Sequence, residues 1–157
     1  MTVQNSYAVY HGEKYAGQVV NLIDSVSRYN GTGDSIPFGY AVVSDGEGKS
    51  KLPTASDTAL TFDGISMREV NRAYSVGETF GAVDGQDFTA ITAAGKVAVV
   101  VGMTVAQNDP VYFGVGADVA GKFMNEAGTG TTAAVLLEKA KFLESGVEDD
   151  AVWVKFS

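Results

Sequence analysis

Short apolar runs separated by polar, glycine-rich stretches recur along the chain. The clearest runs are FGYAVV (38–43), the stretch 62–70 and VYF (111–113). Polar segments with turn chemistry, such as SDGEGKSK and QNDP, stand next to these runs. This spacing is typical of an antiparallel sheet of short strands rather than of a helical protein.

Two later segments show the same strand pattern more strongly. The segment QDFTAITAAGKVAVVVG (86–102) alternates at first, and Gly95 then precedes a β-branched run, so we expect a hairpin with its turn near Gly95. The segment AVWVKFS (151–157) predicts a strand with Trp153 and Lys155 on one face. Its other face carries Val152, Val154 and Phe156.

Two other segments admit more than one interpretation. VVNLIDSVSRY (19–29) fits two or three helical turns or an extended arm, and the loop NGTGDS follows it. On its residues alone the segment 133–143 predicts a short helix, because it has strong helix formers, whereas the resemblance given below favours a strand through AKFLE; we leave helix or strand open there. The predicted fold is mainly β: an antiparallel β-barrel or sandwich, jelly-roll-like, with little helix. We expect an N-terminal arm at 1–35 and a β-domain at 36–157.

Composition and charge narrow the function classes. The chain has 157 residues, no cysteine, one histidine (His11) and a formal net charge of -8. Disulfides and zinc–thiolate sites are therefore excluded, and we expect no metal site. The sequence has no cluster of Lys and Arg of the kind that binds nucleic acid or anionic membranes, so we expect neither as a partner. The longest apolar run, VAVVVGMTVA, is about half of what a bilayer requires.

The glycines of VYFGVGADVAGKF raise the question of a phosphate site. Gly114 and Gly116 are followed by Gly121, which is displaced from the dinucleotide fingerprint, and no long helix can follow. We therefore predict a turn between two strands. No nucleophile elbow or comparable catalytic motif occurs either, so we expect no enzyme, no catalytic residues and no cofactor.

Tyrosine is concentrated near the N-terminus, where five of the seven lie within the first forty residues. Tyrosine suits an interface that is apolar on one side and hydrogen-bonded on the other, although it is also a good strand residue. Residues 1–56 carry five acidic and four basic residues, so this part is nearly neutral while the remainder is acidic. The candidate contact residues are Tyr7, Tyr10, Tyr15 and Tyr29.

The order of several segments resembles a known family. The chain resembles the structural cement, or head decoration, proteins of tailed bacteriophages in the order of four segments. These are SIPFGYAVVSDG, AGKVAVVVGMTVAQNDPVYFGVG, EKAKFLES and the closing AVWVKFS. The resemblance covers nearly the whole chain. The acidic SGVEDD (145–150) and the long NGTGDS loop depart from it, and we assign neither a role.

The resemblance implies a non-enzymatic protein on the outer surface of the virion, made in the cytoplasm of the bacterial host. It would bind the major capsid protein and clamp neighbouring subunits of an icosahedral head against internal DNA pressure. Small symmetric oligomers are common in such proteins, so we expect a homotrimer, with a homodimer as the alternative. The competing hypothesis is a phage tail or receptor-recognition β-domain that binds a carbohydrate or small ligand.

Overall fold

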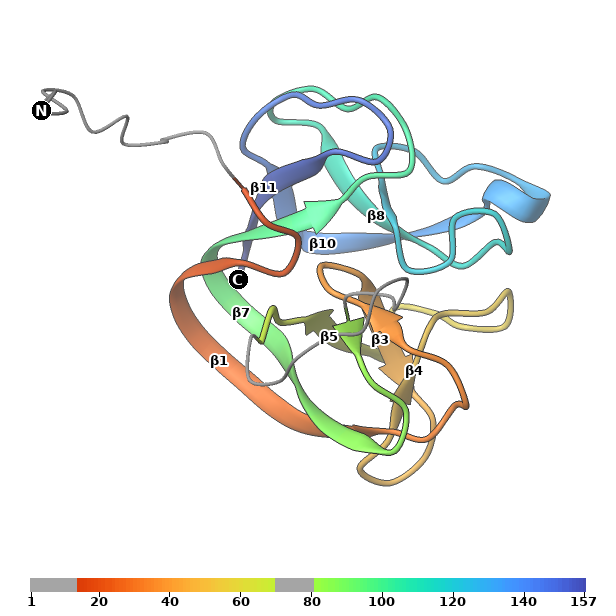
Figure 1. Cartoon of the computed structure of the whole chain (residues 1–157). Coiled ribbons are helices and arrows are strands. Elements are labelled where there is room, and N and C mark those ends of the chain that lie inside the picture. The colour runs from red at the N-terminus through yellow and green to blue at the C-terminus, as the bar shows by residue number, and fades with distance from the viewer. Residues whose placement is uncertain (1–13, 70–80) are drawn as a thin grey trace, which may run out of the picture.

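The fold is an antiparallel, curled half-barrel sheet, described by a computed structural model over residues 14–69 and 81–157 (Figure 1). The predicted class, mainly β and barrel-like with little helix, is confirmed. The elements are β1 (Val19–Asn30), β2 (Ile36–Pro37), β3 (Ala41–Ser44), β4 (Ser50–Lys51), β5 (Phe62–Ser66), β6 (Gly81–Ala82), β7 (Gln86–Val100), β8 (Pro110–Gly114), β9 (Phe123–Met124), a 3-10 turn at Gly130–Thr132, β10 (Ala134–Phe142) and β11 (Ala151–Phe156).

Strand β7 organises the main sheet. The strand order is β4-β3-β5-β7-β11-β10-β8-β9. β1 lies outside this order and also pairs with β7. β2 and β6 form a separate two-stranded sheet. One edge of β7 is thus shared between β5 and β11, while its other edge is covered by β1.

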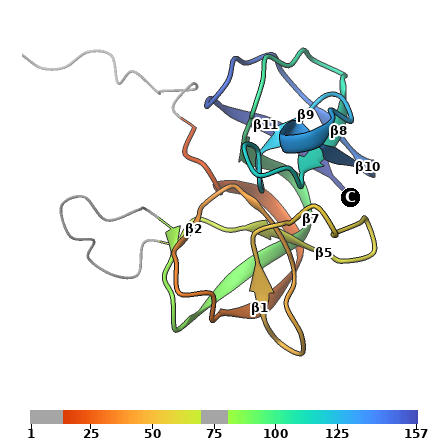
Figure 2. The ribbon, with the colours of Figure 1, turned by 90° about the vertical axis from the view of Figure 1, so that its right-hand side faces the viewer.

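Two hydrophobic clusters lie along β7. Phe88 and Ala90 belong to a smaller cluster with Ile36 and Val42, whereas Ile91 belongs to the larger one. Because Ala90 and Ile91 are adjacent and both fully buried, the strict alternation of buried residues breaks at this point. Figure 2 shows the result: β7 runs between the β2–β5 end of the molecule and the β8–β11 end.

The predicted hairpin at Gly95 is wrong, because β7 continues through this residue without a turn. A Cβ on Gly95 would lie 3.0 Å from Cβ of Asn21 and 3.3 Å from the carbonyl oxygen of Val20. Glycine here allows the backbone of β1 to approach closely, which is the other common reason for a glycine inside a strand.

Both ambiguous segments are strands. The helical interpretation of 19–29 is wrong, since β1 pairs with β7 from Val19 to Asn30. For 133–143 the strand alternative holds: β10 pairs with β8 near its start and with β11 near its end. Its helix formers are overridden because both neighbouring strands offer backbone partners that a helix would leave unpaired.

The glycine stretch after β8 forms a turn, as predicted. β8 pairs with β9 in an antiparallel manner on either side of it. A Cβ on Gly114 would lie 2.1 Å from the carbonyl oxygen of Val119, and one on Gly116 would lie 2.2 Å from that of Thr131. These glycines therefore permit close backbone packing within the loop.

The predicted boundary at residue 35 does not coincide with a break in the sheet. β1 lies on the arm side of this boundary and β7 on the body side, yet ten of the twelve residues of β1 have cross-strand partners on β7. The division into 1–35 and 36–157 stays a prediction. In the described ranges, no helix has the length and apolar character to cross a membrane.

Candidate interaction surface

Strand β1 carries a concentration of exposed apolar side chains. Eight large hydrophobic residues are exposed in the described ranges, and five of them lie between residues 15 and 29. These five are Tyr15, Val20, Leu22, Ile23 and Tyr29. Scattered exposed apolar residues are ordinary, but Val20, Leu22 and Ile23 lie within four residues of one strand, and such a grouping makes this strand a candidate interaction site.

A β-bulge in β1 produces part of this exposure. Asn21 has a φ of +57°, and the pairing register with β7 shifts between Leu22 and Asp24. Ile23 consequently has no partner residue on β7, and its side chain is 62% exposed. A bulged edge is a poor template for adding another strand, so β1 presents side chains more readily than backbone groups.

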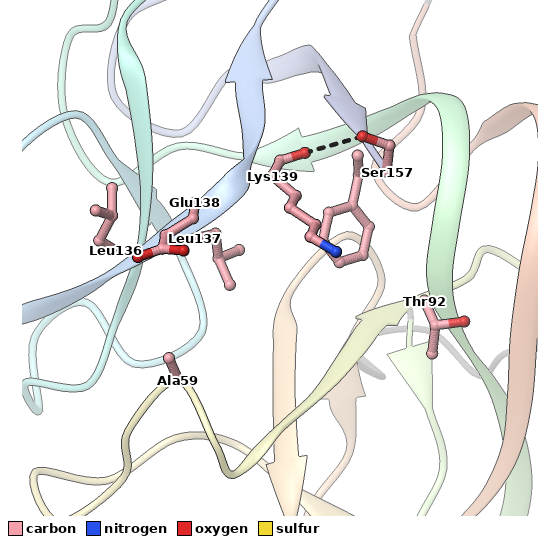
Figure 3. A pocket seen from close by; sticks show the side chains of 8 residues that line it. Ala59, Thr92, Leu136, Leu137, Glu138, Lys139 and Ser157 are labelled. Atoms are coloured by element: carbon pink, nitrogen blue, oxygen red, sulfur yellow. Dashed lines mark hydrogen bonds between the residues drawn. The ribbon is translucent and has the colours of Figure 1, made fainter.

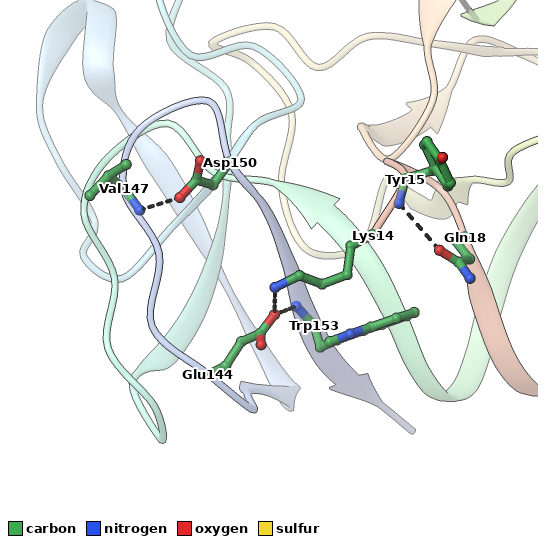
Figure 4. Close-up of polar contacts among 7 residues, drawn as sticks. All are labelled: Lys14, Tyr15, Gln18, Glu144, Val147, Asp150 and Trp153. Atoms are coloured by element: carbon green, nitrogen blue, oxygen red, sulfur yellow. Dashed lines mark hydrogen bonds and ion pairs between the residues drawn. The ribbon is translucent and has the colours of Figure 1, made fainter. Parts of the chain in front are cut away.

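The start of β1 is fixed to the body of the protein. Lys14 forms an ion pair with Glu144, whose Oε1 also accepts a hydrogen bond of 3.0 Å from the backbone N–H of Trp153 (Figure 4). The N–H of Gly17 donates to the carbonyl oxygen of Ala98 at 2.8 Å, so the chain enters β1 along β7. These contacts hold Tyr15 in a defined position.

The end of β1 is fixed as well. Arg28 donates from Nε and Nη2 to the two carboxylate oxygens of Asp63, at 3.0 and 3.2 Å. Asn30 is fully buried, and its Nδ2 donates to the carbonyl oxygens of Asp34 and Ala82. The exposed side chains between these anchors sit on an ordered strand, which lowers the conformational entropy lost when a partner binds.

The predicted tyrosines divide into two groups. Tyr15 and Tyr29 are exposed near the two ends of β1, and the guanidinium of Arg68 lies 4.6 Å from the ring centroid of Tyr15. Tyr7 and Tyr10 lie outside the described residues. The sequence does not predict the exposure of Val20, Leu22 and Ile23, because the scattered apolar residues of 19–29 fit helical turns as well as an extended arm. The signal that was available is the run VVNLI itself, which is apolar without the alternation of a half-buried strand.

A separate hollow of about 410 Å³ lies between the loop at Ala59 and strand β10 (Figure 3). Its lining includes Leu136, Leu137 and the ring of Phe156, which is nearly buried. A carbohydrate-binding site would be expected to present exposed aromatic faces, and Phe156 is the only aromatic residue of this lining. The part of the chain that the structure describes contains no cluster of three or more metal-ligating side chains.

The structure also brings together lysines that are far apart in the sequence. Lys96, Lys139, Lys141 and Lys155 lie on the neighbouring strands β7, β10 and β11. A search for runs of Lys and Arg could not find this group, because its members come together only through strand pairing. The expectation that the protein has no nucleic-acid or membrane partner rests on the lack of such runs in the sequence and stays a prediction.

Three comparisons with known proteins concern the chain as a whole. A search among curated proteins finds no match. A chain from a solved structure, described as "The capsid of Myoviridae Phage XM1", is similar with a TM-score of 0.71 and 24% sequence identity, over 100% of this chain and 98% of that chain. At this identity the likeness shows a shared fold. The family model described as "Structural cement protein (E217 gp24/Pam3 gp6)" matches residues 3–157. The chain thus belongs to the phage structural cement protein family, a family of structural proteins of the phage particle.

Proposed function

We propose that this protein binds the outer surface of the phage head and clamps neighbouring major capsid subunits against the pressure of the packaged DNA. The observation that carries the proposal is β1, an ordered strand with exposed apolar side chains and a tyrosine near each end. Family membership supports a structural role in the capsid.

The dimensions of β1 suit a clamp. Twelve strand residues at about 3.3 Å each span at most roughly 40 Å. A contact of that length is long enough to cross a boundary between two coat subunits. Aromatic and apolar anchors held by a fixed backbone are the features that dominate binding energy in protein interfaces.

The test removes apolar contact area from β1 and leaves its backbone pairing intact. We expect Leu22→Ser combined with Ile23→Ser to weaken binding to heads that lack the protein by about tenfold or more, because loss of an interface anchor costs about 1–2 kcal/mol. Leu60→Ser is the matched control, since Leu60 is 97% exposed but lies in the loop before β5.

The measurement is co-sedimentation of purified protein with undecorated heads over a range of concentrations. Circular dichroism of each variant verifies that the β-sheet is retained. If the β1 double variant binds as tightly as the wild type while Leu60→Ser weakens binding, the contact lies elsewhere on the molecule.

We also propose a homotrimer, with a homodimer as the alternative. Linking several copies of one contact surface multiplies apparent affinity without adding new contacts, and closed symmetry is the usual form of such assemblies. Native mass spectrometry and sedimentation velocity at micromolar concentration measure the oligomeric state. A monomer in solution together with isolated monomers on the head would contradict this part of the proposal.

A further inference from the structure

One face of the main sheet collects four lysines around a tryptophan. Lys141 of β10 and Lys155 of β11 are cross-strand partners, and both are exposed. Lys139 lies two residues from Lys141 along β10 at the edge of this face: its exposed side chain lines a small hollow with Lys141 and Lys155, and also the larger hollow beside Phe156. On the neighbouring β7, Nζ of Lys96 lies 4.6 Å from the ring centroid of Trp153. We call these five residues the lysine face: Lys96, Lys139, Lys141, Trp153 and Lys155.

The buried side chains of the same strands define the orientation of this face. Phe142, Val154 and Phe156 alternate with the lysines and are buried in the larger hydrophobic cluster. Because successive strand residues point to opposite sides of a sheet, Lys141 and Lys155 point away from that core. The lysine face is therefore the outer surface of β7, β11 and β10.

The pairing of Lys141 with Lys155 is unfavourable in the isolated chain. Like charges directly opposite each other on paired strands destabilise a sheet. Neither lysine, nor Lys139, forms an ion pair with any residue in the described ranges. Four other basic residues do have carboxylate partners within ion-pair distance: Lys14, Arg28, Lys51 and Lys122.

This arrangement is unexpected in a chain with 19 acidic residues and a net charge of -8. Carboxylates are abundant, yet the nearby ones do not neutralise the face. Glu144 is paired with Lys14, and Glu138 lines a hollow of about 250 Å³ beside Lys139 and Lys141 without an ion pair to them. The positive charge of the lysine face thus remains available to a partner.

We propose that the lysine face binds a carboxylate-rich surface of a partner protein, and that on the phage head this partner is the coat. The identification of the coat rests on the proposed function. The lysine face adjoins the exposed side chains of β1, because Val20 is the cross-strand partner of Lys96. A coat subunit lying on β1 would therefore extend over the lysines, where its carboxylates would relieve the repulsion between Lys141 and Lys155.

The charge of the whole chain favours a protein partner over nucleic acid. Affinity for a nucleic-acid backbone depends on the number of phosphates neutralised, and at most four lysines are available here. The acidic remainder of the chain would repel a long polyanion. A local carboxylate patch avoids that repulsion, because its contact is confined to the lysine face.

The test reverses the two paired charges. We expect Lys141→Glu combined with Lys155→Glu to weaken binding to undecorated heads by about tenfold or more, and to reduce the loss of binding on adding salt. Lys51→Glu combined with Lys122→Glu makes the same change in net charge outside β1 and the lysine face and is the control; circular dichroism checks that loss of their ion pairs with Asp45 and Asp149 leaves the sheet intact. If both double variants weaken binding equally, only net charge matters and the proposal is overturned.

A single variant separates binding from folding. Lys141→Glu places opposite charges on the β10–β11 pair, so we expect its melting temperature to rise slightly while head binding falls. A higher melting temperature together with weaker head binding would mean that Lys141 lowers the stability of the fold but strengthens binding to the partner. A variant with a higher melting temperature and unchanged binding would overturn the proposal.

A measurement without heads tests the face independently of the proposed function. In a titration of isotope-labelled protein with a short oligo-glutamate, we expect NMR shift changes to map to the lysine face and to disappear in the double variant. A short DNA duplex is the second probe. Stronger binding of the duplex at this face, or no oligo-glutamate shifts there, would overturn the inference. If the oligo-glutamate shifts occur but the wild-type protein fails to bind heads, the proposed function fails and the carboxylate-binding face stands.

Discussion

Asn21 of β1 lies directly against Gly95 of β7, at the point where β1 bulges. A Cβ added to Gly95 would lie only 3.0 Å from Cβ of Asn21. We expect Gly95→Val to destabilise the protein by about 1–3 kcal/mol, because a branched side chain has to displace the β1 backbone. Thermal or urea unfolding followed by circular dichroism measures the effect.

A double-mutant cycle identifies the cause. Asn21→Gly removes the opposing Cβ, and glycine tolerates the φ of +57° at this position. We therefore expect Gly95→Ala to cost less stability in the Asn21→Gly protein than in the wild type. Equal costs in both backgrounds would mean that contact with Asn21 is not what restricts Gly95.

The comparison between Gly95 and the segment 151–157 shows what the sequence can predict. The alternation of AVWVKFS is a property of one strand, and the burial of Val152, Val154 and Phe156 follows it. The role of Gly95 depends on the close approach of β1, which pairs beside it in the sheet, and the local sequence does not encode that approach. Glycine fits both a turn and a close approach, so the local pattern alone led to a hairpin.

The interaction surfaces were predictable only in part. Tyr15 and Tyr29 were identified by composition, and both are exposed on the described surface. The exposure of Ile23 arises from the bulge, which is set by the pairing of β1 with β7. The lysine face depends on the pairing of β10 with β11, so residues 14 positions apart, Lys141 and Lys155, become direct neighbours only in the fold.

Gly17, just before β1, is a position where we expect substitution by any other residue to destabilise the fold. Its φ is +78°, and an added Cβ would lie 2.6 Å from the backbone nitrogen of Arg68 and 2.8 Å from the carbonyl oxygen of Ser66. We expect Gly17→Ala to cost about 3 kcal/mol or more, combining an unfavourable φ with a backbone collision.

Gly33→Ala is the control for this effect. Gly33 has a similar φ of +89°, but an added Cβ meets nothing within 4 Å. We expect it to cost only about 1 kcal/mol, the conformational part alone. Denaturant midpoints of the two variants measure the difference, and equal midpoints would remove the collision from the explanation.

Asp109 is expected to contribute to the acid sensitivity of the fold. Hydrogen bonds from Nδ2 of Asn125 and, next, from the backbone N–H of Ala106 hold the pKa of Asp109 below its ordinary value of 3.8. A lowered folded-state pKa stabilises the protein above the unfolded-state value, and this contribution is lost as pH falls through the folded-state value. Asp109→Asn should therefore reduce the dependence of melting temperature on pH below about 4. An unchanged pH dependence would contradict this role.

The last prediction separates the N-terminal residues from β1. Removing residues 2–34 deletes β1 and uncovers the edge of β7 from Gln86 to Val97. We expect that protein to lose cooperative unfolding or to aggregate, because a long unpaired strand edge is exposed.

Removing residues 2–13 deletes Tyr7 and Tyr10 but keeps every contact described for Lys14, Gly17 and β1. We expect this shorter deletion to retain the sheet, and to weaken head binding if these two tyrosines are contact residues. Circular dichroism, sedimentation and co-sedimentation with heads distinguish the outcomes. If the shorter deletion binds heads as tightly as the whole chain, contact depends on β1 and the lysine face, and Tyr7 and Tyr10 are not anchors. If the longer deletion stays folded and monomeric, the pairing of β1 with β7 is dispensable, and the predicted boundary at residue 35 would then mark a separable arm.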